Sequence, residues 1–96
     1  MATSTGTVTF SFGSAPGTNV VTTTVPWASI TAGSYIELYW QGNDSTATHN
    51  AYEHAMAPLM IRPVVQDITA GVGFTAACLT DYRLTGDFKA RWAGST

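Results

Sequence analysis

Residues 7–12 read TVTFSF, and this strict alternation is the strongest evidence for the fold class. Val8, Phe10 and Phe12 share one face of the segment, and hydroxyl-bearing side chains occupy the other. Successive side chains of a β-strand point to opposite sides, so a period of two predicts a half-buried strand here.

Five more segments have the character of strands. Residues 20–25 (VVTTTV) are branched at Cβ throughout, which disfavours a helix and suits a pleated surface. Residues 34–41 (SYIELYWQ) alternate between an apolar and an amphipathic face. The remaining strands are expected at 59–68, 72–80 and 84–92, with turns at 69–71 and 81–83. Six strands with short turns predict an all-β fold, a small antiparallel β-sandwich or barrel.

One stretch departs from this pattern. Asn50 is followed three positions later by Glu53, the spacing of a capping box, so we expect one short helical turn at 50–56, before Pro58. The length of 96 residues fits one domain. We expect residues 7–96 to form a single β-sandwich domain and the polar residues 1–6 to form an N-terminal arm.

The composition limits the possible functions. Only 10% of the residues are charged, against about 25% in an ordinary globular protein. Such a surface is either neutral and rich in hydroxyl groups or buried against neighbours. Four dispersed Lys and Arg residues and a net charge of −2 argue against nucleic-acid binding. No apolar run approaches the roughly 20 residues that span a bilayer, so we expect no membrane partner.

Residues 49–54 (HNAYEH) form the sharpest candidate for chemistry. On a helical turn His49 and Glu53 share a face, where they could hold a zinc ion or act as a base with its orienting group. The zinc-peptidase pattern of two histidines four residues apart is absent, because His49 and His54 are five apart. We prefer a polar loop joined by hydrogen bonds, or a contact between subunits, with no metal.

Other signs of catalysis are weak. Cys78 is the single cysteine, which excludes an internal disulfide, and its apolar surroundings at 74–79 predict a buried small side chain. No serine lies in a nucleophile elbow, and the glycines at 71–73 are too few for a phosphate loop. We therefore expect no enzymatic activity and no cofactor.

Two tyrosines have an open interpretation. Tyr35 and Tyr39 lie on the amphipathic face of the strand expected at 34–41. They could stack on a sugar ring, or they could pack at a subunit interface, where aromatic side chains are enriched. The scarcity of charge favours the interface.

The stretch 61–74 (IRPVVQDITAGVGF) resembles a recurring signature of virion proteins from tailed bacteriophages. There a Ser/Thr-rich loop with a histidine leads into a short acidic segment, a strand, a GVGF turn and a last strand ending in an aromatic and a small residue. This chain has STATH at 45–49, Glu53, and WAG at 92–94. The resemblance covers about residues 34–94, and Asn50 stands where an acidic residue is usual.

The resemblance implies a β-sandwich on a head, tail or fibre surface. We expect a virion structural protein, made in the host cytoplasm. Its expected role is a head decoration (cement) protein that binds and stabilises the head surface. It would be a homo-oligomer, with three copies expected, and its partners would be the major capsid protein or other virion proteins. The alternative is a fibre-associated or tail-associated module that binds a carbohydrate or a receptor.

Overall fold

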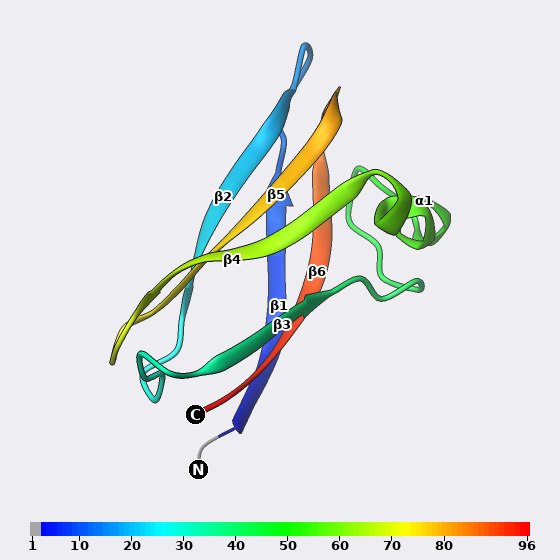
Figure 1. The fold of residues 1–96 in the computed structure, drawn as a ribbon. Coiled ribbons are helices and arrows are strands. Elements are labelled where there is room, and N and C mark those ends of the chain that lie inside the picture. Colours follow the sequence, from blue (N-terminus) through cyan, green and yellow to red (C-terminus); the bar gives the residue numbers. More distant parts are fainter. Residues whose placement is uncertain (1–2) are drawn as a thin grey trace.

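The computed structural model describes residues 3–96, and it confirms the all-β prediction. Six strands form two three-stranded antiparallel sheets, with the orders β1-β6-β3 and β2-β5-β4 (Figure 1). The architecture is an open sandwich and not a closed barrel. The strands are β1 (Thr3–Ser11), β2 (Thr18–Pro26), β3 (Tyr35–Tyr39), β4 (Ile61–Thr69), β5 (Gly73–Leu84) and β6 (Asp87–Ser95).

The two sheets contact each other at both sides of the sandwich. Strand β1 lies over β2, and β3 lies over β4. The expected helical turn is present as α1 (Ala51–Met56), followed by the 3-10 turn η1 (Ala57–Leu59). Figure 1 places α1 at the side of the sandwich, where β4 begins, and both termini at its lower end. Within residues 3–96 no helix could cross a bilayer, since the longest has six residues.

The expected N-terminal arm does not match the observed strand. β1 begins at Thr3, and Thr3 pairs with Ser95 at the far end of β6. Residues 3–6 are therefore part of the sheet, and the prediction for Met1 and Ala2 lies outside the described residues. The polar character of residues 3–6 signalled exposure of their side chains. It carried no information on the backbone, which finds its partner in a strand more than eighty residues away.

The expected turn at 81–83 is wrong. β5 continues to Leu84, and the chain reverses at Thr85 and Gly86 instead. The turn-forming composition produces an irregularity within the strand: Val20 pairs with Leu79, but Thr18 pairs with Leu84. The extra residues of β5 form a bulge, as unpaired residues in an antiparallel ladder do.

Aromatic side chains fill the space between the sheets. Phe10, Phe74 and Phe88 are each at most 2% exposed, and burial of such a side chain contributes about 1.5–3 kcal/mol. At the end near the termini, the ring centroids of Trp27 and Trp92 lie 5.4 Å apart. These large rings fit because the chain places glycines against them. A Cβ on Gly94 would lie 2.7 Å from the Trp27 ring.

Cys78 lies within this core, as its sequence environment predicted. Its side chain is fully buried, and burial raises the pKa of the thiol to about 12. The thiol is therefore neutral at physiological pH, the state in which cysteine is a poor nucleophile.

Candidate functional site

The predicted site residues lie in two separate regions. His49, Glu53 and His54 belong to residues 40–60, which link β3 to β4 and which we call the strap. Tyr35 and Tyr39 lie on the outer face of the sheet β1-β6-β3. The structure therefore does not join the two sets of candidates into one site.

The position of the strap follows from the shortness of β3. β1 pairs with β6 along its whole length, down to Asp87, but β3 pairs with β6 only as far as Arg91. The backbone of residues 87–90 is thus left without a strand on one side. Buried backbone groups need hydrogen-bond partners, so another part of the chain has to supply them.

Side chains of the strap take the place of the missing strand. The Thr46 hydroxyl donates to the Asp87 carbonyl at 2.7 Å, and the Asp87 N–H donates to Thr48 Oγ1 at 2.8 Å. Two residues along, the Lys89 N–H donates to His54 Nε2 at 2.9 Å. The strap therefore satisfies the β6 edge with side-chain atoms where a strand would use its backbone.

His54 is an integral part of this edge. Its Nε2 accepts the Lys89 N–H, while its Nδ1 lies 3.0 Å from the Asn50 carbonyl oxygen, which can only accept. Both contacts are satisfied by a neutral imidazole with its proton on Nδ1. The side chain is fully buried. His54 therefore serves as a fixed acceptor for the β6 backbone.

His49 and Glu53 do come together, as the helical spacing predicted. His49 Nδ1 lies 2.9 Å from Glu53 Oε2, and His49 Nε2 lies 2.6 Å from the Thr85 carbonyl oxygen. Both ring nitrogens thus face acceptors, so the imidazolium form satisfies both contacts. The ring also stacks on Phe88 with a centroid distance of 3.9 Å. His49 fastens the strap to the turn between β5 and β6.

The capping box predicted from Asn50 and Glu53 is present. The Asn50 side chain accepts from the Glu53 N–H at 2.9 Å, and Glu53 Oε1 accepts from the Asn50 N–H at 3.0 Å. The bond from the Asn50 backbone, and then the bond from His49, hold the pKa of Glu53 below its ordinary value. The carboxylate is thereby engaged by both the helix and the imidazole.

The strap is built as a structural element. All four imidazole nitrogens have a partner within the protein. Within residues 3–96, no three His, Cys, Asp or Glu residues are grouped as a metal ion requires. The chemistry that the arrangement supports is hydrogen bonding that orders the strap against β6.

An ion pair that the sequence did not reveal completes the strap. Arg91 Nε and Nη2 donate to the Asp44 carboxylate at 2.9 and 2.7 Å, a bidentate geometry. Asp44 is only 5% exposed. The Arg91 hydrogen bonds are the largest influence on the pKa of Asp44 and hold it below its ordinary value. The two residues are 47 positions apart, and no local pattern links them.

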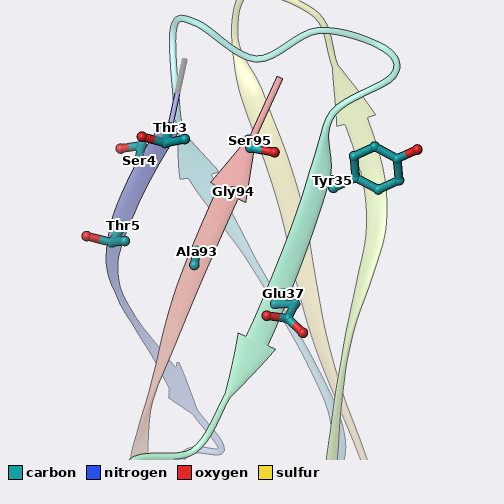
Figure 2. Close-up of a pocket in the computed structure, with 8 residues that line it drawn as sticks. All are labelled: Thr3, Ser4, Thr5, Tyr35, Glu37, Ala93, Gly94 and Ser95. Carbon is teal, nitrogen blue, oxygen red and sulfur yellow. The ribbon is translucent and has the colours of Figure 1, made fainter. Parts of the chain in front are cut away.

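The second region is a shallow trough on the outer face of β1-β6-β3. It has a volume of about 510 Å³. Figure 2 shows Thr5 of β1 on one side, Glu37 of β3 on the other, and the small side chain of Ala93 between them. The Tyr35 ring stands clear of β3 beside this trough and is 80% exposed. Tyr39, 41% exposed, pairs with Arg91 outside it.

Comparisons with protein-family models, with curated proteins and with solved structures find no match to this chain. The function is therefore inferred from the geometry of these two regions and from the distribution of charge over the sandwich.

A pair of glycines tests the contact between the strap and the β5–β6 turn. Gly13 and Gly86 have φ angles of +81° and +80°, so alanine strains the backbone equally at both, by about 1–2 kcal/mol. A Cβ on Gly86 would also lie 2.8 Å from Thr48 Oγ1 and 2.9 Å from His49 Nε2, whereas one on Gly13 meets nothing within 4 Å. We expect Gly86→Ala to cost at least about 1 kcal/mol more than Gly13→Ala.

Urea unfolding of the two variants, followed by tryptophan fluorescence, measures this difference. Equal free energies of unfolding would mean that residues 48 and 49 do not pack against the turn in solution.

The contacts of the strap also predict that the protein loses stability in acid. The pKa values of Asp44 and Glu53 are lowered by folding from 3.8 and 4.5, so the unfolded chain binds more protons in acid. The contribution of these two carboxylates to the free energy of unfolding is complete above their ordinary pKa values. It is lost as the pH falls through their lower pKa values in the folded protein. We expect the urea concentration at the unfolding midpoint to decrease as the pH is lowered below about 4. Asp44→Asn should make this decrease less steep. Asp67→Asn, at an exposed position of β4, is the control and should keep the wild-type slope.

Proposed function

We propose that this chain is a structural subunit of a tailed-phage virion, of the head-decoration type. It works by burying an uncharged side of its sandwich against neighbouring virion proteins. The phage assignment is supported by the resemblance of residues 61–74, and the mode of action by the distribution of charge described next.

The observation that carries the proposal is that one side of the sandwich has no ionisable side chains of the acidic, basic or histidine type. Residues 1–36 contain no Asp, Glu, Lys, Arg or His. β1 and β2 both fall in this stretch, and they lie over one another in the two layers. The first charged residue, Glu37, is on β3, at the opposite side. The ten charged residues are thus confined to the rest of the molecule.

This segregation favours contact with protein. Removing a charge from water is costly unless it is paired, whereas hydroxyl and methyl groups are buried at little cost when hydrogen bonds are replaced. Interface centres are accordingly depleted of charge. The exposed positions of β1 and β2 are mostly threonine, which offers both a methyl group and a hydroxyl group. This side is therefore suited to lie against another β-surface or a capsid protein.

The proposal is tested on virus particles. We expect mass spectrometry of gradient-purified particles of the encoding phage to find the chain at a copy number in fixed ratio to the major capsid protein. A cryo-EM map of those particles should place it on the head. Purified particles that lack the chain would contradict the role.

A charged variant tests the surface. Thr22→Glu combined with Thr24→Glu introduces two charges on the exposed face of β2 and should reduce binding to particles by at least about tenfold, since like or unpaired charges cost several kcal/mol at an interface. Gln66→Glu, an exposed position of β4, is the control and should bind as the wild type does.

A second candidate is the carbohydrate-binding or receptor-binding module of a fibre or tail, and the trough favours it. An aromatic face beside a carboxylate and several hydroxyl groups is the chemistry that recognises a neutral sugar, whose C–H face stacks on the ring while its hydroxyl groups form hydrogen bonds. Among residues 3–96, no Lys or Arg lines the trough, so an anionic sugar is disfavoured.

Alanine variants of two similarly exposed tyrosines distinguish this candidate function from the first. Tyr35→Ala should abolish binding on an array of neutral glycans, because the sugar ring loses the aromatic side chain on which it stacks. Tyr82→Ala, at a residue 76% exposed on the other sheet, should leave binding unchanged. A wild-type chain that binds no glycan on the array would exclude the candidate.

A further inference from the structure

We propose that β1 pairs antiparallel with β1 of a second copy of this chain, which joins two β1-β6-β3 sheets into one sheet of six strands. This inference rests on the proposed role as an assembling subunit and specifies how two copies would meet. It is carried by the contrast between β1 and the other three edge strands.

β1 has an open edge. It is the first strand in the order β1-β6-β3, so β6 pairs with it on one side only. Within residues 3–96, no backbone hydrogen bond joins β1 to anything except β6. The N–H and C=O groups along its other side are therefore available to another strand, as they are on any unprotected sheet edge.

The edges at the far side of the sandwich carry features that hinder such pairing. β3 has only five residues and presents Glu37. β4 contains Pro63 beside Arg62, and its register with β5 breaks between Val65 and Asp67. Short length, charge, proline and bulges are the means by which natural sheets avoid pairing at their edges.

β2 is also protected, although it carries no charge. Its register with β5 breaks between Thr18 and Val20, and the Thr18 side chain turns back onto the Val20 backbone. At the other end the strand finishes at Pro26, which has no N–H to donate. Three of the four edges thus have a specific obstacle to strand addition.

β1 has none of these obstacles. It has nine residues, its register with β6 is unbroken from Thr3 to Ser11, and it contains neither a charge nor a proline. A long, regular and uncharged edge exposed to solvent is a site of pairing with another chain. Of the four edges, β1 is therefore the one to which another strand can add without meeting such an obstacle.

A second copy is the occupant that the side chains of β1 fit. Thr5, Thr7 and Thr9 are exposed on the outer face, and in an antiparallel pair of identical strands they would lie across from one another. Threonine pairs across strands are favourable, through hydroxyl and methyl contacts. The alternate residues Val8 and Phe10 remain in the core of their own subunit. The contact therefore extends the sheet and leaves both cores intact.

The two-fold contact gives two copies, whereas the resemblance led us to expect three. Light scattering on the eluting protein distinguishes the two numbers: we expect twice the 10.2 kDa of one chain. Thr7→Lys places two like charges close together across the pair and should raise the dissociation constant at least about tenfold. The control, Gln66→Lys at an exposed position of the protected edge strand β4, should remain dimeric.

Cysteine cross-linking provides a second measurement that needs no destabilising change. The single native cysteine is buried, so a cysteine introduced on β1 is the reactive one. We expect Thr5→Cys, Thr7→Cys and Thr9→Cys to differ, with fast disulfide formation only at the position nearest the two-fold axis. Gln66→Cys is the control and should stay monomeric on non-reducing gels.

The outcomes separate this inference from the proposed function. A wild-type monomer at about 100 µM, a trimer, or a Thr7→Lys dimer as tight as the wild type would overturn the pairing of β1 strands. If such a chain is still present on purified particles, the structural role stands without the edge contact. A dimer that is absent from particles would instead overturn the structural role alone.

Discussion

The architecture depends on hydrogen-bond partners for the backbone N–H and C=O groups along both edges of β6. This strand is the centre of its sheet, and β1 covers one edge along its full length while β3 covers only part of the other. Because unpaired backbone groups are costly to bury, the strap has to return to residues 87–89. That single requirement explains why His54 is buried and why Thr46 and Thr48 of an irregular loop are fixed in place.

The same requirement decides what the histidines do. A pair of imidazoles near a carboxylate is the residue set of a metal or acid–base site, but here every ring nitrogen is used in holding the strap. Asp44 of the strap meets Arg91 of β6 on the charged side of the molecule. The opposite side, made by β1 and β2, carries no Asp, Glu, Lys, Arg or His.

Local patterns predicted most of the strands and the capping box, because alternation and the Asn50–Glu53 spacing act over a few residues. They failed where a distant partner decided the outcome. Residues 3–6 look like a polar arm, yet they form strand because β6 reaches far enough to pair with them. Residues 81–83 have turn composition, yet β5 continues through them with only an irregularity in its pairing with β2.

The sequence by itself determined the two-faced strands, the buried cysteine, the helix cap and the charge-free first 36 residues, since each follows from residue type and short spacing. The tertiary structure alone decided that His54 accepts from the β6 backbone, that Asp44 meets Arg91, and that β1 is an edge strand without protection. These are contacts, or the lack of them, between segments far apart in the chain. Their energies depend on which backbone groups the whole fold leaves unpaired, and no local pattern records that.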